Sequence, residues 1–361
     1  MTELGDGASL ALKSDFDSVQ KRWLAFWQHE IIDRPCCLVR APKAEAIRRQ
    51  PPPYLAGAKG DLRSVALQVV AWAESIYWGG EAVPYYSPSF GPDMMAAFLG
   101  APLVFPEEKV GTNWAQACID DWEKALPLRL DPDNYWWRRM QEFCRILGEE
   151  CQGKLIVAHL DLHSNMDTLL AMRGAEGLCL DLIDVPELID QAMVQVRALY
   201  APLYECLYEW AGMASSGTCG WVPAYHPTRT NTIQCDFAAL IGSEHFRRWA
   251  LPALVEEASF LGECVYHLDG PDCLVHLDDL CAIEGIKCIQ WVQGAGRKPF
   301  VEWMDLLKYI QSRGVSVWVP CNINDIKLYH AELRPDLVCY DCWAPDEASG
   351  KGILAWLQEN T

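Results

Sequence analysis

Two stretches in the last third of the chain each read as a buried strand that ends in side chains able to bind a metal. His267 and Asp269 close "CVYHLD", and Cys342 closes "VCYDC". Because side chains alternate along a strand, His267 and Asp269 are expected on one side of it. An imidazole, a carboxylate and a thiolate supply three ligands to zinc and leave one position open for catalysis. The alternatives are a turn capped by Asp269 and a buried Cys342 thiol.

Strands and helices alternate from residue 154 onward, roughly every 25 residues, which is typical of βαβ units and a parallel sheet. With at least six such units and no glycine-rich dinucleotide loop, the pattern favours a closed (β/α)8 TIM barrel over an open doubly wound sheet. The expected strands are "KLIVAHLDLH" (154–163), "ECVYHLDG" (263–270), "IKCIQWVQG" (286–294), "VSVWVPCNI" (315–323) and "DLVCYDCWA" (336–344).

The first part of the chain fits this repeat less regularly. "CCLVR" (36–40) reads as a strand, and "DLRSVALQVVAWAESIYWGG" (61–80) reads as a helix. We expect residues 1–80 to form an N-terminal extension with helical decoration and the early barrel units. Because no linker marks a second domain, residues 1–361 are expected to form a single domain.

Further candidates stand near the predicted strand ends, where parallel barrels carry their active sites. In "AHLDLH", the period of two puts His159, Asp161 and His163 on one side. His163 is a candidate to orient substrate, or it bonds a neighbouring carbonyl. Arg229 in "TRTNT" is a candidate cation for an anionic substrate group.

Polar side chains also stand near the ends of two other predicted strands. They are Gln234, Asp236 and Gln290. Because buried polar groups need hydrogen-bond partners, these side chains are expected either to bond one another or to face a ligand.

Composition limits the partners. The chain has 49 acidic and 30 basic residues and a formal net charge of −19, so neither nucleic acid nor an anionic membrane is expected as its main partner. A small molecule is the expected substrate. No apolar run of membrane-spanning length and no signal-peptide pattern occurs, so a cytoplasmic protein is expected, with most of its 16 cysteines reduced.

Several stretches resemble the uroporphyrinogen decarboxylase superfamily of (β/α)8 barrels, which includes corrinoid-dependent methyltransferases. They are "YHLDGPDCLVHLDDL", "IKCIQWVQGAG", "LLAMRGAEGLCLDLIDVPELI" and "IQCDFAALIGSEHFRRWALPAL". Thiol-methylating members carry a zinc site written His-x-Cys, followed by a long gap and a second Cys. The matching positions here are His267, Asp269 and Cys342, with 72 residues between the last two. Members also place substrate-binding groups in the loop that corresponds to "YYSPSFGPDM", so Asp93 is a further candidate, or else a solvated turn carboxylate.

The resemblance implies a metal-dependent, most simply zinc-dependent, methyltransferase that acts on a small molecule. Asp269 stands where a thiolate is expected, and a carboxylate also suits iron or manganese. The chain lacks the paired arginines of true uroporphyrinogen decarboxylases and a corrinoid-binding domain of its own. Any cobalamin is therefore expected on a separate corrinoid protein.

Two other functions remain open on the same scaffold. One is a metal-dependent lyase, decarboxylase or hydrolase, in which the metal activates water or stabilises an enolate-like intermediate. The other is a non-catalytic protein that binds a tetrapyrrole or corrinoid.

Overall fold

The computed structural model describes residues 9–361 apart from 45 and 107–110, and its main feature is a seven-stranded sheet. The strand order is β2-β1-β13-β12-β11-β10-β9, and every neighbouring pair is parallel except β1 with β2. The strands are β1 (Cys36–Pro42), β2 (Ile76–Gly80), β9 (Thr232–Gln234), β10 (Cys264–Asp269), β11 (Ile286–Val292), β12 (Ser316–Asn322) and β13 (Val338–Trp343).

Shorter strand pairs lie beside this sheet. β3 (Tyr85–Tyr86) pairs with β6 (Ile156–Val157) in parallel, and two further pairs are antiparallel. Those are β4 (Leu103–Val104) with β5 (Trp114–Ala115), and β7 (Thr218–Cys219) with β8 (Tyr225–His226). Within the described residues, strand pairing does not close into one continuous ring, so the molecule is an α/β protein with a mostly parallel sheet.

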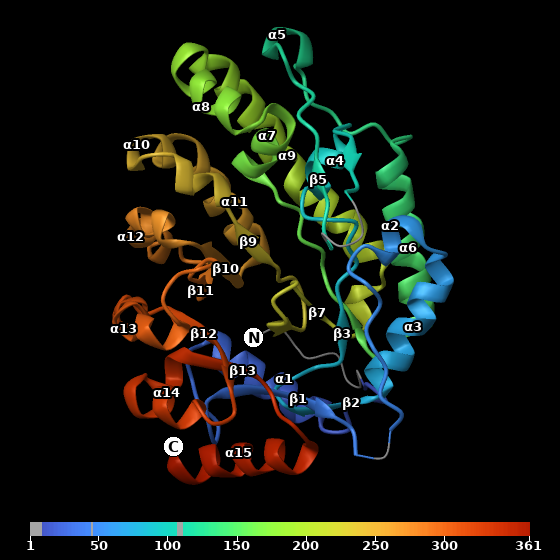
Figure 1. Cartoon of the computed structure of the whole chain (residues 1–361), viewed down its shortest axis with the longest axis vertical. Helices are drawn as coiled ribbons and strands as arrows, with labels where there is room; N and C mark the ends of the chain where they lie inside the picture. Colours follow the sequence, from blue (N-terminus) through green and yellow to red (C-terminus); the bar gives the residue numbers. More distant parts are fainter. Residues whose placement is uncertain (1–8, 45, 107–110) are drawn as a thin grey trace.

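Helices surround the strands (Figure 1). The long α9 lies on the opposite side of the molecule from α13 and α14, while α15 runs outside β1 and β13 (Figure 1). The helices are α1 (Phe16–Trp27), α2 (Ala56–Lys59), α3 (Leu62–Glu74), α4 (Met94–Phe98), α5 (Trp122–Ala125), α6 (Tyr135–Cys151), α7 (Asn165–Arg173), α8 (Ala175–Asp184), α9 (Pro186–Trp210), α10 (Ser243–His245), α11 (Leu251–Leu261), α12 (Leu277–Cys281), α13 (Met304–Ser312), α14 (Ile326–Glu332) and α15 (Glu347–Asn360). None of the helices in the described ranges combines the length and apolar character needed to cross a bilayer.

The predicted strands β1 and β10 to β13 are confirmed, but the helix expected over 61–80 is too long. It begins after Asp61, whose side chain accepts a hydrogen bond from the backbone amide of Ser64, and it ends at Glu74. The residues that follow, "IYWGG", form β2 against the edge of β1. The β-branched and aromatic residues at the start of this segment favour a strand, its two glycines disfavour a helix, and β1 supplies the free edge.

A buried ion pair joins the start of β1 to the end of β2. Arg34 donates to both carboxylate oxygens of Glu81, at 2.5 and 2.8 Å, and the backbone amide of Cys37 donates to the same carboxylate at 2.8 Å. Glu81 is fully buried and Arg34 is 8% exposed. Arg34 therefore fixes β1 and β2 together.

Arg34→Met removes the bidentate partner of the buried Glu81 carboxylate and leaves it only Arg22, whose Nε lies 3.7 Å from Oε1, so the free energy of unfolding is expected to fall by about 3 kcal/mol. Arg138→Met is the matched control, because Arg138 pairs with Asp133 on the surface, where about 1 kcal/mol or less is expected. Urea unfolding of both variants measures the difference. Equal, small losses would show that the buried pair does not hold the two strands.

Candidate active site

A cavity of about 620 Å³ opens where several strands end. Its walls come from β3 and the loop after it, the segment after β6, and the carboxyl ends of β9 and β10. The lining residues are Pro51, Tyr54, Trp72, Tyr85, Tyr86, Ser87, Ser89, Pro92, Asp161, His163, Trp221, Gln234, Asp236 and His267. The carboxyl ends of parallel strands are the usual place for an active site, so this cavity is the candidate.

His163 is held between carboxylates in the wall of the cavity. Its Nδ1 lies 2.9 Å from Asp93 Oδ1, its Nε2 lies 3.2 Å from Asp236 Oδ2, and Asp167 Oδ2 is 3.8 Å from the same Nε2. Burial by itself lowers the pKa of His163, but hydrogen bonds to Asp236 and Asp93 raise it, and the net pKa lies well above the usual value. The geometry therefore favours a doubly protonated imidazolium.

The neighbouring carboxylates divide into different protonation states. Asp167 is fully buried and accepts hydrogen bonds from the backbone amides of Asp236 and Phe237, at 2.9 and 2.8 Å. Burial raises the pKa of Asp167 to about 7. Burial also raises the pKa of Asp236, but its hydrogen bond to His163 and the nearby imidazoles outweigh this effect, and the pKa of Asp236 falls below the usual value. Asp236 is thus the ionised partner of His163.

His267 has a different environment from His163. Its Nδ1 lies 2.7 Å from the side-chain oxygen of Gln290 on the neighbouring strand β11. Because an amide oxygen only accepts, Nδ1 donates to it, and Nε2 is the nitrogen left for a metal. Ligand atoms of His267, Asp236 and Asp269 all lie within 4.8 Å of one another.

A second group, formed by His163, Asp167 and Asp236, also has its ligand atoms within 4.8 Å. It is the poorer metal site. Both nitrogens of His163 already face carboxylates, and an imidazolium offers no lone pair. Asp236 belongs to both groups, so it links the candidate metal ligands to the protonated histidine.

The structure brings together His267 and Asp269, which were predicted as metal ligands, but not Cys342. Following the register across the sheet, His267 lies on the same face as Gln290, Trp318 and Cys339. Cys342 is three residues beyond Cys339 and therefore lies on the opposite face.

The helix layer covers that opposite face. Cys342 is the register partner of Val39, and Val39 Cγ1 lies 2.7 Å from the place that a Cβ would take at Gly350 of α15. The Cys342 thiol is 1% exposed beneath α15. Cys342 is not part of the cluster around His267 because strand alternation turns it toward the helices.

The three residues predicted to contact substrate do not all lie at the cavity. Asp93 and His163 meet in the site, as the distance above shows. Arg229 does not, because it precedes β9 and stands at the amino end of that strand. Its guanidinium pairs with Glu205 at 2.5 Å, packs over the ring of Phe260 and remains about half exposed.

His159 does not share a side with Asp161 and His163 as predicted. The strand β6 ends at Val157, so the alternation expected over 154–163 does not continue to these residues. The His159 ring stacks on Tyr204 of α9 at 4.0 Å and is fully buried, and burial lowers its pKa to about 4. It is a core residue.

The sequence identified Asp236 as a polar side chain near a strand end, but it did not identify Asp236 as a candidate metal ligand. It comes two residues after β9, and β9 pairs with β10 beside His267. Asp167 was missed, since it lies within α7 and the sequence carries no sign that this helix turns a carboxylate toward the site.

A buried acid braces the loop that carries His163. Glu257 of α11 accepts a hydrogen bond from Ser164 Oγ at 2.7 Å and from Asn165 Nδ2 at 3.3 Å. His163 and Asn165 both have positive φ, 49° and 54°, so the chain turns sharply on each side of Ser164. Burial raises the pKa of Glu257 to about 8, which makes the acid neutral near pH 7.

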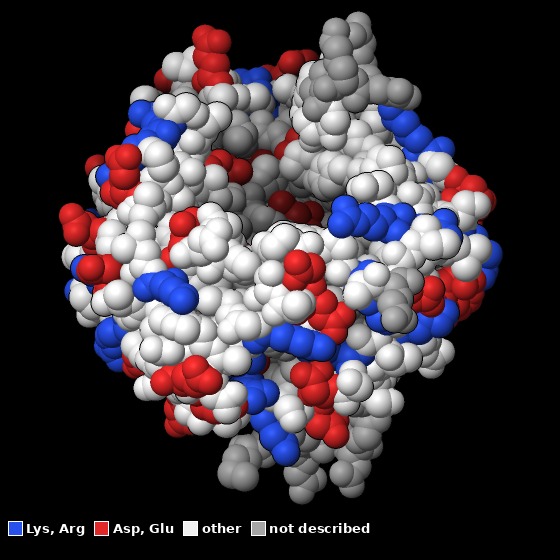
Figure 2. Space-filling view, turned by 60° about the horizontal axis from the view of Figure 1, so that its bottom comes forward, with Lys and Arg blue, Asp and Glu red and all other residues white. Residues whose placement is uncertain are grey.

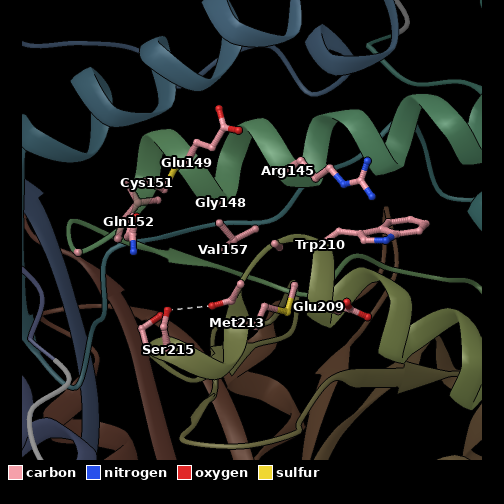
Figure 3. A pocket seen from close by; sticks show the side chains of 15 residues that line it. Arg145, Gly148, Glu149, Cys151, Gln152, Val157, Glu209, Trp210, Met213 and Ser215 are labelled. Carbon is pink, nitrogen blue, oxygen red and sulfur yellow. Dashed lines mark hydrogen bonds between the residues drawn. The ribbon is translucent and has the colours of Figure 1, made fainter.

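Another hollow, of about 380 Å³, lies between the ends of α6 and α9 (Figure 3). Arg145 and Glu149 project from one side of it, and Glu209 and Trp210 from the other (Figure 3). It borders residues just before β6, at the end of the strand opposite to His163. Burial raises the pKa of its cysteine, Cys151, to about 12, so it offers no activated thiol.

The raised pKa of His163 has a direct spectroscopic consequence. We expect ¹⁵N NMR to show this imidazole as the doubly protonated form at pH 7.5, where an ordinary histidine is neutral. Asp93→Asn removes one negative partner and should move the titration to lower pH. Asp184→Asn is the control, because Asp184 is exposed on α8. A neutral His163 at pH 7.5 in the wild type would contradict this arrangement.

Glu257 should make stability depend on pH. Its pKa is about 8 in the folded state against 4.5 as the ordinary value, so the folded state binds the proton more tightly. The contribution of this tighter proton binding to the free energy of unfolding is fully present below the ordinary pKa. It is lost as pH rises toward 8, by up to about 1.4 kcal/mol per pH unit. Glu257→Gln should remove this loss, so at pH 8.5 the variant should unfold at a higher temperature than the wild type. Thermal unfolding from pH 5 to 9 tests it, with the exposed neighbour Glu256→Gln as control.

Comparisons with known proteins come from structure rather than sequence. No protein-family model matches the chain, and no curated protein matches it. Among solved structures, a methyltransferase from Methanosarcina mazei matches with a TM-score of 0.59 and 12% identity, over 95% of this chain and 98% of that one. At this identity the likeness concerns the fold alone, and the chain therefore shares the fold of that methyltransferase along almost its full length.

Proposed function

We propose that this protein is a metal-dependent enzyme that transfers a methyl group to or from a small molecule. The observation that carries the proposal is the group of Asp236, His267 and Asp269, placed at the carboxyl ends of β9 and β10 beside an open cavity. The shared fold with a methyltransferase supports the reaction class. In the same proposal, the chain forms a (β/α)8 barrel in which the short strands β3, β6 and β7 fill the gap between β1 and β9.

The three side chains fit a divalent metal. One nitrogen and two carboxylates can bind zinc, and they suit manganese or iron(II) equally because no thiolate is present. Gln290 orients His267 as the amide or carboxylate partners of metal-bound histidines do. A metal held there would bind and activate a thiol, alcohol or water of the acceptor.

The remaining side chains act on the bound small molecule. His163 holds a fixed positive charge at the cavity wall between Asp93 and Asp236, where it can stabilise negative charge that develops on the substrate. Asp93 fixes the orientation of His163 through its Nδ1. In the methyltransferase proposal, a corrinoid carried by a separate protein brings or removes the methyl group.

A second candidate is a metal-dependent lyase, decarboxylase or hydrolase. One observation favours it. Cys342 lies on the other face of β13, so the site lacks the soft sulfur ligand that suits thiol activation. An oxygen-rich site is also suited to activating water.

Metal content separates the ligand set seen in the structure from the one expected from the sequence. Plasma mass spectrometry of untagged protein should find near-stoichiometric metal in the wild type. His267→Ala and Asp236→Asn should each reduce it at least about tenfold, while Cys342→Ser should retain it. If Cys342→Ser loses the metal and Asp236→Asn keeps it, the sequence-based set is correct. A wild type that stays metal-free after reconstitution overturns the proposal.

The reaction class is tested with the metal-loaded protein and free methylcobalamin. Transfer to a thiol converts methylcobalamin to cob(I)alamin and the thiol to a thioether, and both products are measured. His267→Ala should abolish the transfer. If hydrolysis of a small ester or amide proceeds without any methyl donor and methylcobalamin is not consumed, the second candidate replaces the first.

A further inference from the structure

The cavity that carries the candidate metal ligands has a distinctive lining. Five of its lining residues are aromatic and none is Lys or Arg: the aromatic ones are Tyr54, Trp72, Tyr85, Tyr86 and Trp221. Asp161 and Asp236 add carboxylates to the same wall. Aromatic faces and carboxylates both attract cations, and neither favours an anion.

Carboxylates outnumber basic side chains around the cavity. Five carboxylates stand in or beside it: Asp93, Asp161, Asp167, Asp236 and Asp269. Arg40, which lies near Tyr85, does not change this balance because it forms an ion pair with Asp341. Figure 2 shows acidic side chains inside a hollow on one face of the molecule.

Two buried polar atoms of the lining have no partner within the described part of the chain. The side chain of Gln234 is 5% exposed, and its Oε1 accepts no hydrogen bond there. The indole Nε1 of Trp221 likewise has no acceptor. Buried polar atoms need partners, so the cavity calls for a ligand with both a hydrogen-bond donor and an acceptor.

We propose that the small-molecule substrate is a protonated N-methylated amine that also carries an oxygen. Its ammonium N–H would donate to Gln234 Oε1, its methyl groups would pack on the aromatic walls, and its oxygen would accept from Trp221. This inference rests on the proposed function for the choice of cavity, and it adds the class of substrate. It also replaces the anionic substrate implied by Arg229, which stands at the far end of β9.

Ligand binding tests the substrate class with three probes of nearly equal shape. The cation is 2-(dimethylamino)ethanol, protonated at neutral pH; the neutral isostere is 3-methylbutan-1-ol; and the anion is 3-methylbutanoate. Calorimetry with metal-loaded protein should give an affinity for the cation at least about tenfold above that for the alcohol, because only the cation gains the electrostatic attraction of the aromatic rings and carboxylates. Equal affinities, or tighter binding of the anion, would overturn the proposal.

Variants test the assigned contacts. Trp221→Leu should weaken binding of the cation more than binding of the alcohol, because only the cation uses the electrostatics of the ring. Tyr135→Leu is the control, an aromatic residue that is 62% exposed on α6. Gln234→Met should weaken the dimethyl amine but not choline, which has no N–H. If the Trp221 and Gln234 variants weaken the binding of all probes equally, the contacts proposed for these two side chains are wrong.

Metal content of the same samples keeps the two proposals apart. A metal-loaded protein that prefers the alcohol or the carboxylate would reject the amine and leave the metal site standing. A protein that binds the amine selectively but holds no metal after reconstitution would reject the metal-dependent enzyme and leave the cation cavity standing.

Discussion

Repulsion among carboxylates gathered around one cavity is the constraint on which the rest of the site depends. Charges of one sign cannot be buried together unless protons, donors or counter-ions balance them. His163 supplies a positive charge to Asp93 and Asp236, and two backbone amides satisfy Asp167. The segments that follow β6 and β9 and the loop before α4 thus each contribute an acid or the group that neutralises one.

The residues behind the cavity wall also avoid an unbalanced negative charge. Glu257 is buried behind the loop of His163, where a charge would add to the repulsion, and burial makes it a neutral acid instead. In that form it still accepts hydrogen bonds from Ser164 and Asn165 and so fixes a backbone turn that only a few residue types tolerate. Helix α11 is therefore as much a part of the site as the strands are.

The strands near the C-terminus were predictable because their signal is local. Apolar runs at a regular spacing gave β10 to β13 within a few residues, and the same alternation put His267 and Asp269 on one side. The alternation also shows why Cys342 does not join the candidate metal ligands, since it lies three positions after Cys339, whose side chain is on the inner face. A spacing that matches a family motif does not fix the face of a strand.

Other parts of the site depend on contacts that no local pattern contains. The strand β6 is only two residues long, so His163 is placed by turns at positive φ rather than by a strand period. The pairing of Asp236 with His267 depends on β9 lying beside β10. Such contacts follow from tertiary neighbours, which the sequence alone did not identify.

The partners of His163 are far away along the chain, and this has a consequence for how the protein folds. Asp93 lies 70 residues before His163, and Asp236 lies 73 residues after it. Bonds that close such long loops form late, because the entropy of the intervening chain must be lost first. Until then the acids repel one another without their counter-charge. Assembly of this cluster should accordingly be among the last steps of folding, so that a protonated His163 marks a chain whose central segments have already docked.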